Sequence, residues 1–253
     1  MSTDAALAPR WDVERIFVDG DEFFADLISG IRSATQQIQL QYYIFRDDPL
    51  GLRILSELRS AAKRGIKVQL LVDGIGSLNY IESYQDEILS SGIEFLIFKP
   101  VKWIRVIRNL LPFISESGVF NFIEYSNRRN HRKLCLIDKT KAWGGGMNVS
   151  SCHVQEFSGE GAWRDTGIYV EGIGLEDLNS DFDLIWNAVK SRGRINRKFF
   201  KSIKPQIAPD LVRLNTARKM RRKNYKEILL RIKRAKTRVW LTQAYFVPHI
   251  SAL

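Results

Sequence analysis

A histidine, a lysine and an asparagine stand close together near the middle of the chain. His131 and Lys133 open an apolar run that ends at Asp138, and Asn148 follows a run of three glycines. The apolar run, residues 134–137, predicts a short buried strand. Side chains two residues apart on a strand point to the same face, so those of His131 and Lys133 should converge. An imidazole beside a fixed cation suits attack at a phosphate, because the cation counters charge on the non-bridging oxygens.

The same residues match a known signature. The chain resembles the phospholipase D superfamily, whose pattern is His-x-Lys-x4-Asp-x6-Gly-[Gly/Ser]-x-Asn. Every fixed position is met, by His131, Lys133, Asp138, Gly145, Gly146 and Asn148. The resemblance implies that His131 attacks phosphorus and forms a phosphohistidine. It also implies that Lys133 and Asn148, with Gly145 and Gly146, bind the phosphate. For an isolated His131, a solvated side chain in a basic loop would be the alternative.

Two carboxylates complete the expected site. Asp138 belongs to the catalytic signature, but it stands at the end of the strand, an odd number of residues after His131. Its side chain should therefore point to the opposite face, and we expect it to orient the turn. A covalent histidine mechanism also needs a carboxylate that fixes the imidazole tautomer. The resemblance to the cardiolipin synthase branch, which has a Trp-x-Asp about thirty residues past the histidine, assigns this role to Asp165. A surface carboxylate paired with Arg164 is the alternative.

The composition is that of a globular protein without disulfides or membrane spans. With 253 residues, of which 45% are hydrophobic, the chain can hold one large or two small domains. Two cysteines are too few for a disulfide framework, which favours a reducing compartment. No apolar run approaches the roughly eighteen residues of a membrane span, and the first residues lack the layout of a signal peptide. We therefore expect a cytoplasmic protein.

The positive charge is concentrated in one segment. The chain carries a formal net charge of +11, from 39 Lys and Arg against 28 Asp and Glu. Residues 190–238 alone contain 19 of these basic residues and only 2 of the acidic ones. Such a block suits anionic lipid headgroups or a nucleic-acid backbone. A solvated helix face with loops is the alternative, and the charge by itself does not distinguish lipid from nucleic acid.

Helical and strand patterns alternate along the first half of the chain. Helices are predicted at residues 23–34, 50–64, 78–91 and 175–189, and strands at residues 38–45, 67–72, 93–98, 134–137 and 167–171. Two strands joined by a helix favour a parallel pair. This pattern predicts an α/β fold, and the resemblance implies a phospholipase D-like mixed sheet flanked by helices. We expect Tyr43 and Phe45 in its core.

A basic amphipathic stretch precedes the motif. Residues 100–114 place four aliphatic side chains on one helical face, carry Trp103, and hold their cations away from the centre of that face. This pattern is typical of an element at a membrane surface. An ordinary core-facing helix is the alternative.

The end of the sequence repeats part of its beginning. Residues 232–246 match residues 31–45, 201 positions earlier, with Ile, Ala, Leu and Phe coinciding. This echo predicts a second copy of the domain that starts near Lys223. By the same offset a second catalytic histidine would fall near position 332. Neither His153 nor His249 has a lysine two residues further on.

Three regions are therefore expected. They are a first phospholipase D-like domain with the single motif (1–200), a basic linker (201–222) and the beginning of a second, incomplete domain (223–253). In the superfamily one histidine attacks while a second protonates the leaving alcohol. We expect this chain to hold half a site, either as a truncated copy or as half of an assembly that pairs two motifs.

The resemblance implies a phosphatidyltransferase of the cardiolipin synthase type. Phosphatidylglycerol would donate through His131 and a glycerol-bearing phospholipid would accept, without a metal or other cofactor. The expected partners are anionic phospholipid, the inner membrane surface, where the protein would lie peripherally, and a second copy or half-enzyme; nucleic acid is less favoured. Two alternatives stay open. One is a phosphodiesterase or nuclease that uses water as acceptor, and the other is a non-catalytic half-enzyme that binds anionic membranes.

Overall fold

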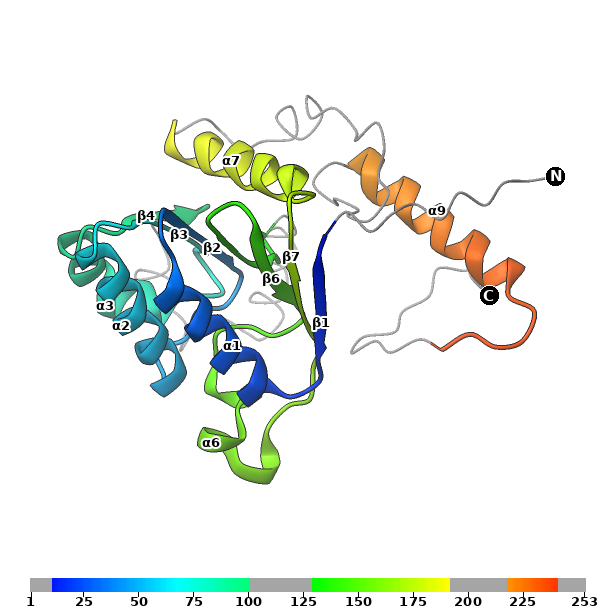
Figure 1. The fold of residues 1–253 in the computed structure, drawn as a ribbon, viewed down its shortest axis with the longest axis horizontal. Coiled ribbons are helices and arrows are strands. Elements are labelled where there is room, and N and C mark those ends of the chain that lie inside the picture. Colours follow the sequence, from blue (N-terminus) through cyan, green and yellow to red (C-terminus); the bar gives the residue numbers. More distant parts are fainter. Residues whose placement is uncertain (1–10, 101–128, 192–217, 241–253) are drawn as a thin grey trace, which may run out of the picture. The chain divides into compact units, whose positions relative to one another are not determined.

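A computed structural model describes residues 11–100, 129–191 and 218–240. The chain divides into two compact units, Met1–Gly193 and Arg194–Leu253. The first unit contains a seven-stranded sheet with helices against both of its faces (Figure 1). The described part of the second unit consists of helix α9 (Arg218–Arg234) and residues 235–240.

The sheet is mixed, with strand order β1-β7-β6-β5-β2-β3-β4. The strands are β1 (Val13–Phe17), β2 (Gln37–Tyr42), β3 (Lys67–Asp73), β4 (Glu94–Phe98), β5 (Lys133–Ile137), β6 (Lys141–Gly145) and β7 (Gly167–Glu171). Strands β2, β3 and β4 run parallel to one another. Strand β5, at the centre of the sheet, is antiparallel to both β2 and β6, so the pairing changes there from parallel to antiparallel.

Helices join the parallel strands. Helix α1 (Gly20–Ser33) connects β1 to β2, α2 (Pro49–Lys63) connects β2 to β3, and α3 (Leu78–Ser90) connects β3 to β4. The short α6 (Gln155–Ser158) and the longer α7 (Glu176–Lys190) come after the motif. Two aspartates cap the first two helices, because Asp19 accepts a hydrogen bond from the backbone of Glu22 and Asp48 from that of Gly51. Pro49 then stands at the start of α2, where no backbone donor is needed.

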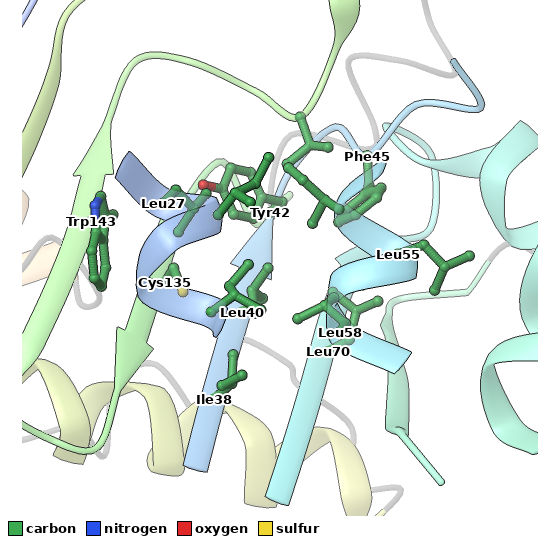
Figure 2. Packing of buried hydrophobic residues seen from close by; sticks show 14 of the residues in the cluster. Leu27, Ile38, Leu40, Tyr42, Phe45, Leu55, Leu58, Leu70, Cys135 and Trp143 are labelled. Atoms are coloured by element: carbon green, nitrogen blue, oxygen red, sulfur yellow. The ribbon is translucent and has the colours of Figure 1, made fainter. Parts of the chain in front are cut away.

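The apolar core lies between the sheet and helices α1 and α2. Ile38, Leu40 and Tyr42 of β2 are fully buried on this face (Figure 2). Trp143 of β6 packs against α1 at Gly30, where an added Cβ would lie 2.4 Å from the indole ring. Because glycine has no Cβ, it lets the helix approach the tryptophan closely at this position.

The opposite face of β2 is polar and lies on the side of α7. Gln39 donates to the side chain of Gln69 on β3 at 2.9 Å and to Asp183 of α7 at 3.1 Å. Gln41 is also fully buried, but its side-chain amide has no hydrogen-bond partner among the residues that the structure describes. One buried amide on this face is thus bonded to its surroundings and the other is not.

The predicted α/β fold with a mixed sheet is confirmed, and so is the parallel pairing of the strands on either side of α2. One strand is shorter than predicted, because β2 ends at Tyr42 and the chain leaves the sheet before Phe45 makes an isolated bridge to Val149. Strand β1 is not predicted by the sequence pattern. Its residues are mostly exposed at the edge of the sheet, so they lack a regular apolar alternation.

Three expectations fall wholly or partly outside the described residues. They are the amphipathic stretch up to residue 114, most of the basic linker, and the strand of the second repeat after residue 240. The three domain boundaries stay predictions. Helix α9 ends at Arg234, which is 201 positions after Ser33 at the end of α1, in keeping with the offset of the sequence echo.

The two buried glutamines give a test of the polar face. Replacing Gln41 by leucine should stabilise the fold by about 1 kcal/mol, because it removes a buried amide that has no hydrogen-bond partner among the described residues. The matched change Gln39→Leu should destabilise it by about 1–2 kcal/mol, because Gln69 and Asp183 lose their donor. Urea denaturation of both variants measures these changes, and a destabilised Gln41→Leu protein would contradict the first expectation.

Candidate active site

The motif lies at one end of the sheet because of the strand directions. Tyr42, the last residue of β2, pairs with Lys133, the first residue of β5. Strand β6 runs back along β5 and ends at Gly145, at the same end. The segment with His131, which leads into β5, and the segment with Asn148, which follows β6, therefore lie at the same end of the sheet. The sequence spacing of the motif is thus converted into proximity by two antiparallel pairings.

The His131 side chain is exposed and rests on an aromatic ring. Its imidazole stacks on the phenol ring of Tyr43, with ring centroids 3.9 Å apart and an angle of 17° between the planes. The Lys133 ammonium group donates to the carbonyl oxygen of His131 at 3.0 Å. The Lys133 ammonium nitrogen also lies 5.8 Å from the centroid of the Tyr43 ring, so both side chains are found next to this ring. The expectation of a core position is confirmed for the buried Phe45 but wrong for Tyr43, which lies in the site.

The surroundings of His131 favour a neutral imidazole. Partial burial lowers the pKa of His131 and the nearby Lys133 cation lowers it further, while the Asp73 carboxylate acts in the opposite direction. Burial also lowers the pKa of Lys133, and Asp165 partly offsets this. A neutral imidazole keeps the lone pair that a nucleophile needs.

The glycine run after β6 approaches its neighbours too closely for side chains. Gly145 has a φ of 136°, and a Cβ there would lie 2.3 Å from the carbonyl oxygen of Thr166. A Cβ on Gly146 would lie 2.0 Å from the Asp165 carboxylate. The two glycines that match the signature thus allow this loop to pack on the Asp165–Thr166 segment.

Asn148 is held by its neighbours on two sides. Its side-chain oxygen accepts a hydrogen bond from the backbone of Ile44 at 3.3 Å, and its backbone donates to the imidazole of His153, also at 3.3 Å. No described residue accepts a hydrogen bond from the side-chain nitrogen of Asn148. This group can therefore donate to an anion.

Asp138 lies at the other end of β5 from His131. Its carboxylate accepts hydrogen bonds from the backbone of Thr35, Gln36 and Gln37 and from the Thr35 hydroxyl, at 2.8–2.9 Å. Partial burial alone would raise the pKa of Asp138, but these hydrogen bonds together lower it below its ordinary value. The geometry favours the structural role over a part in the chemistry.

Asp165 lies beside the glycine loop and not against His131. It accepts a hydrogen bond from the backbone of Thr166 at 2.7 Å and is close enough to Lys133 and His153 to influence their pKa values. Within the described part of the chain no hydrogen bond joins it to His131. Its proposed role in fixing the imidazole of His131 is therefore not realised by direct contact in this structure.

Three residues of the site are not singled out by the sequence. Tyr43 stacks on His131, and Asp73 accepts a hydrogen bond from the backbone of Asn130, immediately before it. His153 is buried, and its imidazole accepts a hydrogen bond from the backbone of Asn148. The sequence points toward Asp73 through its place directly after the predicted strand at residues 67–72.

The described residues contain no group of three or more His, Cys, Asp or Glu side chains placed to hold a metal ion. Cys135 is buried in β5, and both it and Cys152 are free thiols. None of the helices in the described ranges has the length and hydrophobicity that a membrane span requires.

Comparison with known proteins identifies the family. A family model described as "Cardiolipin synthase, PLD-like domain" matches residues 27–156, a range that includes His131, Lys133 and Asn148 but not Asp165. The chain belongs to this family, which is a branch of the phospholipase D superfamily.

Individual relatives carry the same name. A cardiolipin synthase of Halalkalibacterium halodurans is 32% identical over 237 residues, which are 92% of this chain and 44% of that protein. One of Staphylococcus aureus is 35% identical over 182 residues, 72% of this chain and 34% of that protein. The chain thus spans less than half the length of these relatives. A solved phosphatidylserine synthase from Haemophilus influenzae gives a TM-score of 0.49 at 16% identity, over 70% of this chain and 37% of that one.

The hydrogen bonds of Asp138 predict a loss of stability when they are removed. Asp138→Ala should destabilise the fold by about 1–2 kcal/mol at neutral pH, because three backbone amides and the Thr35 hydroxyl lose a charged acceptor at a partly exposed position. Since the folded-state pKa is lowered, this contribution is present above the unfolded pKa and disappears as pH falls through the folded one. Urea denaturation at neutral and acidic pH measures both effects. Asp86→Ala, on the exposed side of α3, is the control and should change little.

Proposed function

We propose that the protein is a phosphatidyltransferase of the cardiolipin synthase type that acts through His131. The observation that carries this proposal is the exposed imidazole of His131, which stacks on Tyr43 next to the Lys133 cation. Partial burial and this cation lower the pKa of His131, which favours the neutral form that a nucleophile needs. Family membership supports phospholipid as the substrate class. The names of the relatives support cardiolipin formation as the reaction.

In the first step His131 attacks the phosphorus of a phosphatidylglycerol. A phosphorus–nitrogen bond forms, the bond from phosphorus to the headgroup glycerol oxygen breaks, and the glycerol leaves after taking up a proton. In the second step a hydroxyl of another glycerol-bearing phospholipid attacks the same phosphorus. The phosphorus–nitrogen bond breaks, the hydroxyl proton is lost to a base, and His131 is restored.

Lys133 and Asn148 stabilise the charge that develops on the phosphoryl oxygens. Lys133 is the first residue of β5 and Asn148 follows the end of β6, so both residues lie at the same end of the sheet. Their donors are held in place before the reaction, Lys133 by the carbonyl of His131 and Asn148 by Ile44. Donors that need no reorganisation are the most effective way to stabilise such charge.

The leaving glycerol requires a general acid that His153 does not supply. His153 is only 5% exposed, and its Nε2 accepts a hydrogen bond from the backbone of Asn148 and so carries no proton to donate. We therefore propose that the acid comes from a second motif, in a second copy of this chain or in a further half of the enzyme. The echo between residues 31–45 and 232–246, and the matching ends of α1 and α9, support a second repeat.

We also propose that the protein works peripherally at the inner membrane surface. Helix α9 carries nine Lys and Arg residues and one Glu, with the exposed apolar side chains of Tyr225, Ile228 and Leu230 among them. Cations together with apolar side chains favour anionic lipid headgroups.

A labelled lipid tests the proposed function. Purified protein is mixed with phosphatidylglycerol labelled at phosphorus, in mixed micelles. One portion is quenched in alkali, where phosphohistidine survives, and lipid is extracted at neutral pH from another portion to measure cardiolipin. Wild type should carry the label and form cardiolipin, whereas His131→Ala should do neither. Lys133→Ala should lower the rate of labelling by about 100-fold or more, because a charge-stabilising donor is lost.

The matched control is Lys63→Ala, an exposed cation at the end of α2, which should leave the rate unchanged. Release of phosphatidic acid without cardiolipin would mean that water is the acceptor and that the protein is a phosphodiesterase. Absence of label from wild-type protein that still binds anionic vesicles would contradict an enzymatic role for this chain.

A further inference from the structure

Tyr43 occupies an unusual position for an aromatic residue next to a strand. It follows the last residue of β2 and is half-buried, while its neighbours Tyr42 and Phe45 are fully buried in the core. Its ring stacks on the imidazole of His131, and Tyr43 is not among the described apolar residues that pack on the core cluster. Within the described residues, the side chain of Tyr43 thus packs on the face of the His131 ring.

The backbone around Tyr43 is locked by the turn that follows β3. Ser77 donates to the carbonyl oxygen of Tyr43 at 3.1 Å and accepts from the backbone of Phe45 at 2.9 Å. A Cβ on Gly76 would lie 2.2 Å from the same carbonyl oxygen and 3.1 Å from the phenol ring. The turn therefore lies close against both the carbonyl group and the ring of Tyr43.

The same turn also holds the segment that carries His131. The Asp73 carboxylate, which is fully buried, accepts from the backbone of Ile75 and Gly76 within the turn and from the backbone of Asn130 at 3.1 Å. The guanidinium of Arg129 lies 3.7 Å from this carboxylate. One turn thus fixes both the ring of Tyr43 and the residue before His131.

Lys133 also lies near the ring of Tyr43. Its ammonium nitrogen lies 5.8 Å from the centroid of the Tyr43 ring, within the range of a cation–π interaction, while it donates to the carbonyl of His131. A single aromatic ring therefore contacts both side chains that the signature pairs.

We propose that Tyr43 is a positioning residue that sets the plane of the His131 imidazole for attack on phosphorus. The proposal rests on the assigned role of His131 as nucleophile. Attack in line with the leaving group requires a fixed direction of the nitrogen lone pair, and a misplacement of about 1 Å can lower a rate about 100-fold. The proposed role belongs to the flat ring, so the phenol hydroxyl should be dispensable.

The first experiment measures the position of the ring without any enzymatic activity. The imidazole signals of the full chain are titrated by NMR, and that of His131 is identified by its loss in His131→Ala. Tyr43→Phe should keep the ring-current shift and the lowered pKa of His131. Tyr43→Leu and Tyr43→Met should lose the ring-current shift. Their His131 pKa should rise toward its ordinary value, because burial is the main cause that lowers it and Lys133 and Asp73 remain.

The second experiment measures the reactivity of His131 with potassium phosphoramidate. In this reaction the donor's phosphorus–nitrogen bond breaks and a phosphorus–nitrogen bond to the imidazole forms. The protonated nitrogen leaves as ammonia, which takes up the proton that the imidazole loses and becomes ammonium. No second motif is needed, because the leaving nitrogen is already protonated. Phosphorylation of His131 should be about as fast in Tyr43→Phe as in wild type and about 10- to 100-fold slower in the leucine and methionine variants.

The outcomes separate this proposal from the proposed function. Equal phosphorylation rates in all four proteins, or an unchanged ring-current shift in Tyr43→Leu and Tyr43→Met, would overturn the positioning role. A slow Tyr43→Phe protein would also overturn it, since the hydroxyl and not the ring would then matter. Cardiolipin formation that fails in wild type, with the phosphoramidate pattern as expected, would contradict only the lipid reaction.

Discussion

The antiparallel pairing of β5 with β2 on one side and β6 on the other is the constraint on which the site depends. A strand that runs against both of its neighbours begins where they end. The residues before Lys133, the residues after Tyr42 and the glycine loop after β6 are therefore brought to one end of the sheet. Without this reversal, the two parts of the signature would lie about a strand length apart, roughly 15 Å for five residues.

The charged groups of the signature are then separated by the length of β5. Asp138 is saturated by backbone donors at one end, whereas Lys133 stands at the other end beside an exposed imidazole. The strand between them is apolar and its middle residue, Cys135, is fully buried. Charges at both ends of a buried strand are tolerated because one is fully hydrogen-bonded and the other remains near the surface.

Local patterns account for most of the fold. The beginning of α2 follows from Asp48 and Pro49, and its end from Gly65, because caps and turns are decided by neighbouring residues. The edge strand β1 is not recognisable in this way, since it has little buried surface and depends on pairing with β7. Local patterns likewise do not predict which strands become neighbours in the sheet.

The order of residues alone is enough to propose His131, Lys133 and Asn148 as site residues, because their spacing matches a signature and two strands bring them to one end of the sheet. Only the folded chain decides what surrounds them. It places Tyr43 against the imidazole, Asp73 behind the segment that carries it, and Asp165 beside the glycine loop. These contacts join segments far apart in sequence, so they depend on strand order and packing, which no local spacing encodes.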